Sequence, residues 1–289
     1  MLRPIFKKIL LTGIVLLSAY FTNAQTVSKP DNTPPEWSAP YQPFRIAGNL
    51  YYVGTYDLAC YLITTSEGLI LINTGLANSV DMINKNIETL GFKPGDIRIL
   101  LTTQAHNDHV SGMAAIQRLT GAKMMVDRGD SSVVADGGKS DYALSNYYEP
   151  IKIDRILNNG DTIKLGDARL VMLHHPGHTR GSCSFLFDVR DEQRSYRVLI
   201  ANMPTIVTSK KFSSITTYPE IEKDYAYTLR EMKKLSFDLW LSSHASQFDL
   251  HKKHKPGDKY NPAAFIDKTG YDAELKDLQL EFSKKLKEK

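Results

Sequence analysis

The most informative part of the sequence is Ile99-Leu100-Leu101-Thr102-Thr103-Gln104-Ala105-His106-Asn107-Asp108-His109, because an apolar strand runs here directly into a loop of side chains that can bind metal. Imidazole and carboxylate are side chains that bind zinc, at about 2.0 to 2.2 Å. Alternate positions leaving a strand point to one side, and the following turn adds Asp108 and His109. A loop of this kind can serve two metal ions.

The alternative is a polar connection whose histidines only cap a helix, and two further segments argue against it. Both are apolar strands that lead to a histidine: Leu173-His174-His175-Pro176-Gly177-His178-Thr179-Arg180-Gly181-Ser182 and Phe237-Asp238-Leu239-Trp240-Leu241-Ser242-Ser243-His244. Three separate strands therefore end in histidine. This pattern is typical of an active site assembled at one edge of a sheet.

The order of these motifs resembles the metallo-β-lactamase superfamily. The matching residues are Gln104-x-His106-x-Asp108-His109, then Gly177-His178-Thr179, then Ser243-His244, whereas the usual first motif of the family is His-x-His-x-Asp-His. With Gln104 at the first position, and with the segments 44–55 and 243–248, the chain resembles the GOB-type branch of subclass B3. The resemblance extends from Trp37 to the last helix.

The resemblance implies a ligand set for zinc, with one or two ions per chain. Gln104, His106 and His178 would hold one ion, and Asp108, His109 and His244 the other. The implied activity is hydrolysis of the β-lactam amide bond of penicillins, cephalosporins and carbapenems by a metal-activated hydroxide, which confers antibiotic resistance. Asp108 is expected to orient the hydroxide as well, and either Asp108 or a water molecule to pass a proton to the leaving nitrogen, since a metal-bound carboxylate is a poor acid.

Gln104 weakens one of these sites on chemical grounds. An amide oxygen is neutral and binds zinc less well than imidazole. We therefore expect the site of Asp108, His109 and His244 to bind zinc more tightly, and to support activity alone when zinc is limiting.

Other residues are predicted from their loop positions. Contacts to the β-lactam are expected from Lys139, Tyr142, Met203, Thr205 and Ser246. Met203 falls where related lactamases of other subclasses place a zinc-binding cysteine, and it is expected to line the pocket. Among the remaining histidines, a structural or supporting role is expected for His174 and His175, and a solvated surface position for His251 and His254.

Two other classes of function remain open. The first is another hydrolase on the same scaffold, either a thioesterase of the glyoxalase II type or a lactonase, because these enzymes resemble the same superfamily. Those relatives generally bridge two metals with an aspartate after the strand that corresponds to residues 196–201. Here Asn202 and Met203 follow that strand, and neither is a carboxylate, which favours the lactamase. A non-catalytic zinc or ligand binder is the second alternative, and spare coordination argues against it because structural zinc sites are closed.

The N-terminus predicts export. Arg3, Lys7 and Lys8 precede an apolar run over residues 9–19, and Thr22-Asn23-Ala24 ends in a small-residue cleavage pattern. We expect a signal peptide over 1–24, cleavage before Gln25, and a periplasmic protein. The alternative is an uncleaved membrane anchor, and the length of the run argues against it because a membrane span needs roughly 20 residues. No membrane association is expected after cleavage.

Composition restricts the partners. The chain has 289 residues, of which 42% are hydrophobic and 24% charged, as in a globular protein. Loss of residues 1–24 removes three of the 36 Lys and Arg and none of the 32 Asp and Glu, so the formal charge falls from +4 to +1. The sequence contains no basic stripe interleaved with aromatic residues, so we expect no nucleic-acid partner. We also expect a monomer. Cys60 and Cys183 fit either a disulfide or two buried thiols.

Hydrophobic periodicity predicts strands and helices in alternation along the chain. Strands are expected over 44–47, 50–55, 59–64, 69–73, 97–102, 123–126, 162–165, 169–174, 184–189, 196–201 and 238–241, and helices over 79–90, 110–119, 131–135, 221–235 and 273–286. The two halves suggest two packed sheets with helices outside. The resemblance implies a four-layer αβ/βα sandwich of two mixed β-sheets, formed by a single domain over 25–289.

Overall fold

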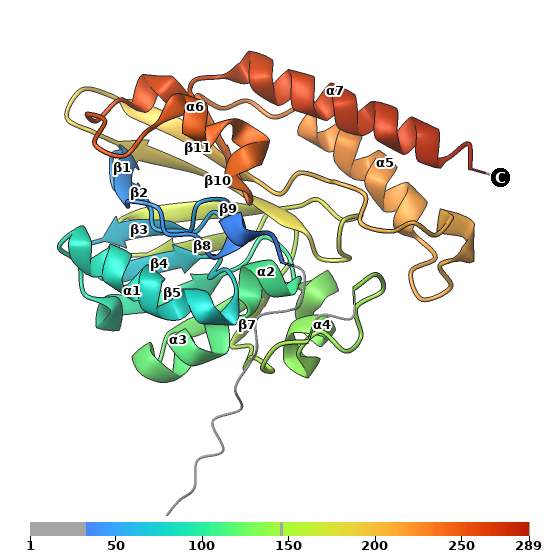
Figure 1. Ribbon diagram of the computed structural model, residues 1–289, viewed down its shortest axis with the longest axis horizontal. Helices are drawn as coiled ribbons and strands as arrows, with labels where there is room; N and C mark the ends of the chain where they lie inside the picture. The colour runs from blue at the N-terminus through green and yellow to red at the C-terminus, as the bar shows by residue number, and fades with distance from the viewer. Residues whose placement is uncertain (1–32, 145–146, 289) are drawn as a thin grey trace, which may run out of the picture.

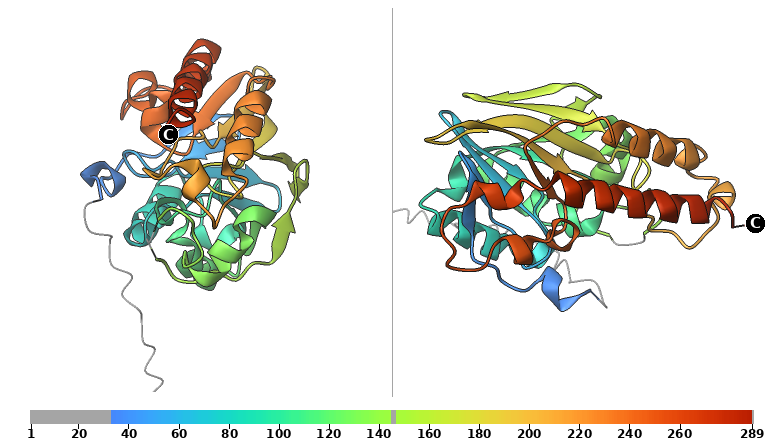
Figure 2. Two further views of the ribbon diagram at one scale, coloured as in Figure 1. Left: turned by 90° about the vertical axis from the view of Figure 1, so that its right-hand side faces the viewer. Right: turned by 90° about the horizontal axis from the view of Figure 1, so that it is seen from above.

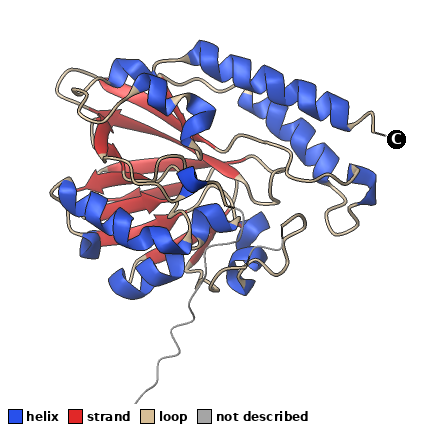
Figure 3. Ribbon diagram, in the orientation of Figure 1, coloured by secondary structure: helices blue, strands red, loops and turns tan. Residues whose placement is uncertain are grey.

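The computed structural model describes residues 33–144 and 147–288. Two β-sheets lie face to face in the middle of the molecule, and helices cover the outer face of each (Figure 1; Figure 3). This is the expected four-layer α/β sandwich of two mixed sheets. The predicted signal peptide over 1–24 lies outside the described residues. Within them, no helix combines the length and apolar character needed to cross a membrane.

The first sheet has seven strands in chain order, β1-β2-β3-β4-β5-β6-β7. They are β1 (Phe44–Ala47), β2 (Leu50–Tyr52), β3 (Tyr61–Thr65), β4 (Gly68–Ile72), β5 (Ile97–Leu101), β6 (Lys123–Asp127) and β7 (Arg155–Leu157). The first four pair antiparallel as a meander, whereas β4 to β7 run parallel. The carboxyl ends of the parallel strands therefore share one edge of the sheet.

The second sheet has five strands in the order β12-β11-β10-β9-β8. They are β8 (Thr162–Leu165), β9 (Ala168–His174), β10 (Cys183–Arg190), β11 (Ser195–Ala201) and β12 (Leu239–Ser242). All pairs are antiparallel except β11 with β12, which is parallel.

Helices cover the two outer faces. The α-helices are α1 (Val80–Thr89), α2 (Asn107–Val110), α3 (Met113–Thr120), α4 (Ser131–Asp136), α5 (Ile221–Met232), α6 (Leu250–Lys253) and α7 (Lys268–Lys285). Short 3-10 helices are η1 (Pro35–Trp37), η2 (Ala77–Ser79), η3 (Pro94–Asp96), η4 (Arg128–Asp130), η5 (Phe212–Ser214), η6 (Ala245–Phe248) and η7 (Pro262–Phe265). Helices α1 and α3 flank the first sheet, and α5 and α7 run side by side over the second (Figure 1; Figure 2).

Two apolar cores hold the layers together. The larger core joins the inner faces of both sheets, for example Ile70 and Phe185, with the helices over the second sheet. The smaller core packs Leu100 and Met124 of the first sheet against Ile83 and Ile116 of its helices. Strands β4, β5 and β12 are buried along most of their length and are almost continuously apolar, whereas β10 and β11 each alternate buried and exposed residues toward one end.

The two sheets meet at the edge where β5 and β12 end. Thr103 follows β5, and its hydroxyl lies 2.8 Å from the hydroxyl of Ser243, which follows β12. The backbone carbonyl of Thr103 also accepts the N–H of Cys183 at 2.8 Å. Residues distant in sequence are in this way fixed side by side.

Several predicted boundaries differ from the structure. Strand β7, whose residues Arg155 and Ile156 are exposed, is absent from the predicted strands because its short sequence has little apolar pattern. The helix predicted over 110–119 is two helices, α2 and α3, separated at Ser111 and Gly112. Helix α7 begins at Lys268, five residues before the predicted start, where the Asp267 side chain accepts the Gly270 N–H at 2.8 Å.

Candidate metal centre

The loop after β5 is held in shape by buried polar contacts from its neighbours. Asn73 follows β4 in the left-handed region, with φ 61°. Its side-chain oxygen accepts the backbone N–H of Thr103 at 3.0 Å, and the next residue, Thr74, donates its N–H to the His109 carbonyl at 2.8 Å. Because both ends of the loop are fixed, its metal-binding side chains point toward the meeting edge of the sheets.

Asp108, His109 and His244 form one cluster at this edge. Their ligand atoms all lie within 4.8 Å of one another. Oδ2 of Asp108 lies 3.0 Å from Nε2 of His109 and 3.2 Å from Nε2 of His244. The first sheet supplies Asp108 and His109, and the second supplies His244.

Gln104, His106 and His178 form the second group of predicted ligands. Nδ1 of His106 lies 3.1 Å from Nε2 of His178, although 72 residues separate them in the chain. Gln104 is only 3% exposed. Its Oε1 has no hydrogen-bond partner among the described residues.

These atoms fit zinc. Two ligands of one tetrahedral zinc ion lie about 3.3 Å apart when each bond is about 2.0 to 2.1 Å. The separations of 3.0, 3.1 and 3.2 Å are close to that value. Oε1 of Gln104 is also buried without a partner in the described part of the chain, and such an atom is costly unless a ligand satisfies it.

Two carboxylates that the sequence analysis did not single out contact the second ring nitrogen of two of these histidines. Asp57 Oδ2 lies 3.0 Å from Nδ1 of His244, and Asp141 Oδ2 lies 3.3 Å from Nε2 of His106. A carboxylate on the second ring nitrogen fixes the tautomer of a metal-ligating histidine. Neither aspartate stands in a recognisable motif, so only spatial proximity reveals this role.

The ionisation of these groups follows from burial and pairing. Burial lowers the pKa of His178 to about 3, so its ring is neutral and can bind metal. For His244, burial lowers the pKa, but hydrogen bonds with Asp108 and Asp57 outweigh this and raise it to about 9. Burial would raise the pKa of Asp108, yet His109 and His244 bring it well below its usual range.

Two residues predicted to contact substrate form hydrogen bonds with the turn of His178. The Thr205 carbonyl and hydroxyl lie 2.8 and 3.0 Å from Nδ1 of His178. The Tyr142 hydroxyl donates to the carbonyls of Gly177 and His178, at 3.1 and 3.0 Å. Both residues are half-buried, and these contacts give them a role in holding the ligand loop.

The other three predicted contacts differ from one another. Met203 is 1% exposed and packs into the larger core, and the expectation that it lines the pocket stays a prediction. Ser246 is exposed and donates its backbone N–H to Asp57 at 2.9 Å. Lys139 is exposed in the segment after α4.

The remaining histidines are outside the two ligand groups. His174 pairs with Asp127 at 2.9 Å, and His175 with the Ser184 hydroxyl at 2.7 Å. The expected surface position of His254 is wrong, because its ring stacks on Phe44 at 3.5 Å and is 8% exposed. His251 is half-buried and stacks on Tyr56 at 3.8 Å.

Both cysteines are free and buried.

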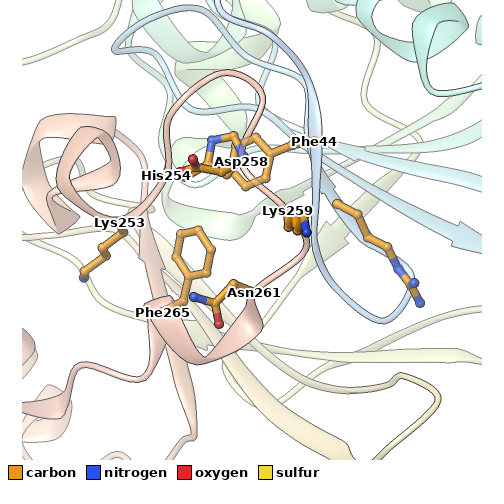
Figure 4. Close-up of a pocket in the computed structure, with 8 residues that line it drawn as sticks. Phe44, Lys253, His254, Asp258, Lys259, Asn261 and Phe265 are labelled. Atoms are coloured by element: carbon orange, nitrogen blue, oxygen red, sulfur yellow. The ribbon is translucent and has the colours of Figure 1, made fainter.

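A pocket of about 240 Å³ lies away from these ligands, between β1 and the segment after α6 (Figure 4). Phe44, His254 and Phe265 line it with charged side chains at its rim. None of the six predicted zinc ligands lines this pocket, so the pocket is not part of the metal centre.

Sequence and structure comparisons identify related proteins. The family profile described as "Metallo-beta-lactamase superfamily" matches residues 54–191. The structure is similar to the class B3 di-zinc metallo-beta-lactamase LRA-12 from an Alaskan soil metagenome, with 64% identity over 89% of this chain and 99% of that chain and a TM-score of 0.88. For the metallo-beta-lactamase GOB-18 from Elizabethkingia meningoseptica, identity is 55%, coverage is 92% and 100%, and the TM-score is 0.90.

Curated relatives are more distant. A hydroxyacylglutathione hydrolase of a Bradyrhizobium species is 28% identical over 120 residues, which is 40% of each chain. An N-acyl homoserine lactonase of a Bacillus species is 24% identical over 204 residues, 61% of this chain and 74% of that one. The chain thus spans less than half the length of the first of these relatives.

Proposed function

We propose, from the premise that this chain belongs to the class B3 metallo-β-lactamases, that it is a zinc-dependent β-lactamase. Its substrates are penicillins, cephalosporins and carbapenems, and their hydrolysis confers antibiotic resistance. The observation that carries the proposal is the convergence of two sets of buried ligand atoms, from three loops, at one edge of the paired sheets.

The proposed ligands divide by geometry. Gln104, His106 and His178 hold the first zinc ion. This assignment rests on the distance of 3.1 Å between Nδ1 of His106 and Nε2 of His178. Asp108, His109 and His244 hold the second zinc ion. This assignment rests on the contacts of Asp108 Oδ2 with Nε2 of His109 and of His244. Asp57 and Asp141 orient His244 and His106 through their other ring nitrogens.

The reaction adds water across the β-lactam amide. When bound, zinc supplies an acidified water molecule and polarises the carbonyl. The water oxygen bonds to the carbonyl carbon, the C–N bond breaks, and the nitrogen takes up a proton. The products are a carboxylate and an amine on the opened ring.

Asp108 has a second proposed role in this reaction. Besides binding the second zinc, its carboxylate orients the attacking water and transfers a proton to the leaving nitrogen. Its pairing with both His109 and His244 fixes the direction of Oδ2. Among the described residues of this ligand cluster, Asp108 supplies the carboxylate and the other two members are histidines.

We also propose how the chain is processed. A signal peptide over 1–24 directs export and is cleaved before Gln25, and residues 25–289 form one domain that acts as a periplasmic monomer. Mass spectrometry of the protein recovered from the periplasm tests the cleavage site. Cleavage elsewhere, or retention in the membrane fraction, contradicts it.

The test of function is hydrolysis of a carbapenem and of a thioester by the purified mature chain, with stoichiometric zinc and again after chelation. Zinc-dependent loss of the carbapenem without thioester turnover supports the lactamase. Thioester or lactone turnover without β-lactam loss would mean that the active site hydrolyses a different substrate class. Zinc binding without any turnover would indicate a binding protein.

A further inference from the structure

The turn that carries His178 is held from two sides. Tyr142 donates to the carbonyls of Gly177 and His178, and Thr228 Oγ1 donates to the carbonyl of Pro176 at 2.6 Å. These bonds fix the part of the turn before and at His178. The part after it, residues 179–182, is fixed by a different element.

That element is η4, at the end of β6 in the other sheet, where Asp130 is 1% exposed. Asp130 Oδ2 accepts the Thr179 hydroxyl at 2.7 Å, and Oδ1 accepts the Gly181 backbone N–H at 2.8 Å. Both carboxylate oxygens are therefore used by the same turn. Asp130, which follows β6 of the first sheet, thus holds the turn after β9 of the second sheet.

The two segments are in backbone contact, which leaves no room for a side chain at Gly129 or Gly181. A Cβ on Gly181 would lie 2.2 Å from the backbone nitrogen of Asp130, and a Cβ on Gly129 would lie 2.2 Å from the Arg180 carbonyl oxygen. Thr179 extends the network, because its hydroxyl lies 2.8 Å from that of Ser182 and its N–H donates to the same oxygen at 2.6 Å.

His178 lies at the junction of the two halves of this turn, next to Thr179. Gly177, before it, has φ +128°, a conformation that side chains rarely adopt. The direction of the His178 ring depends on the contacts that hold this turn in shape. A site with the neutral ligand Gln104 is especially sensitive to that direction, because each remaining ligand must be well placed.

We infer that Asp130 is a positioning residue for the first zinc site, which acts through Thr179 and Gly181 to hold His178 in the direction that binds metal. The inference rests on the ligand assignment in the proposed function. It assigns Asp130 no contact with substrate or metal. Its effect is confined to the site of Gln104, His106 and His178, because His178 is the one of the six proposed ligands that lies in the turn held by Asp130.

The experiment is a titration of the zinc-free full mature chain with zinc, in competition with a chromophoric chelator, for the wild type and for Asp130→Ala, Thr179→Val and Thr179→Ser. Histidine ring signals in NMR spectra assign each binding step to His178 and His106 or to His109 and His244. Asp154→Ala is the matched control. Its carboxylate also accepts a backbone N–H, that of Met124 at 3.0 Å, at the opposite end of β6.

Asp130→Ala and Thr179→Val are expected to weaken the first site by about 10- to 100-fold, as for other residues that orient metal ligands. The second site should change by less than about twofold, and Thr179→Ser, which keeps the hydroxyl, should restore the first site. If Asp130→Ala fails to fold, Thr179→Val carries the test alone, because valine matches the shape of threonine and removes only the hydrogen bonds.

An equal loss at both sites, or no loss at the first, would overturn the inference. Failure of the proposed function has a different signature, because a wild-type chain that takes up no zinc at His106 and His178 removes the first site altogether. Carbapenem hydrolysis is measured separately, and its absence in a wild type that binds two zinc ions contradicts the activity while leaving the role of Asp130 supported.

Discussion

Three of the four histidines proposed to bind zinc owe their direction to a partner on the second ring nitrogen. His244 has Asp57, His106 has Asp141, and His178 has Thr205. Such partners choose the tautomer and stop the ring from rotating, so the cost of ordering the ligand is met during folding and not during metal binding. The chemistry of a single residue is thus set by atoms far away in the sequence.

The identity of Gln104 leads to the first prediction. Zinc added to the metal-free chain should fill the site of Asp108, His109 and His244 first, because it has a charged ligand and two imidazoles, whereas Gln104 offers a neutral amide. Gln104→His should tighten the other site and leave this one unchanged. Calorimetric titration of both chains measures the two steps. Two equal, tight steps in the wild type would refute the asymmetry.

The second prediction concerns Asp57. Its two oxygens serve His244 Nδ1 at 3.0 Å and the Ser246 N–H at 2.9 Å, and an amide has only one oxygen. Asp57→Asn should therefore lower zinc affinity at the site of His244 by about 10- to 100-fold. Chelator competition measures this change. The exposed Asp81 of α1, changed to Asn, is the control, and an Asp57→Asn chain with unaltered affinity would exclude the orienting role.

At the scale of the element, short loops place the supporting residues, and close backbone approach fixes those loops. The segment from Gly54 to Leu58 carries Asp57 and closes with a bond from the Thr55 N–H to the Leu58 carbonyl at 3.0 Å. A Cβ on Gly54 would lie 2.2 Å from that carbonyl oxygen. Glycine is required here by lack of space.

The third prediction follows from this crowding. Gly54→Ala should lower the free energy of unfolding by about 1 to 3 kcal/mol, the usual cost of forcing atoms into a packed site. Gly95→Ala is the matched control, since nothing lies within 4 Å of its Cβ position, and it should stay within about 0.5 kcal/mol. Urea unfolding of the metal-free chains measures both. Equal midpoints for the two variants would count against the steric argument.

At the scale of the whole molecule, the proposed second zinc joins the two sheets. Asp108 and His109 belong to the loop after β5, and His244 follows β12 of the other sheet. The Thr103–Ser243 contact at 2.8 Å lies at the same edge. Metal at this position would resist separation of the layers, in addition to its chemical role.

The fourth prediction is that chelation destabilises the whole fold. A ligand that binds only the folded chain stabilises it by about 4 kcal/mol when its free concentration is about 1,000 times its dissociation constant. Removal of zinc should therefore lower the unfolding midpoint of the wild type. In His244→Ala, which has lost the ligand from the second sheet, chelation should shift the midpoint less. Equal shifts in both chains would indicate that zinc does not join the sheets through His244.

Much of this protein is determined by its sequence alone. The alternation of apolar strands and amphipathic helices predicts the two sheets and their covering helices, because burial on both faces requires that pattern. The ordered motifs around His106, His178 and His244 point to zinc because the types of side chain and their spacing are chemical facts of the chain. Strand β7 escapes prediction because a short, exposed strand has no such pattern.

Only the tertiary structure decided what surrounds the ligands. Asp57, Asp130 and Asp141 look in the sequence like ordinary loop aspartates. Their roles depend on which loops meet at the edge of the paired sheets, where Asp57 reaches His244 across 187 residues of chain. A sequence pattern records the local period of an element, whereas a contact between distant loops is fixed only when the two sheets pack together.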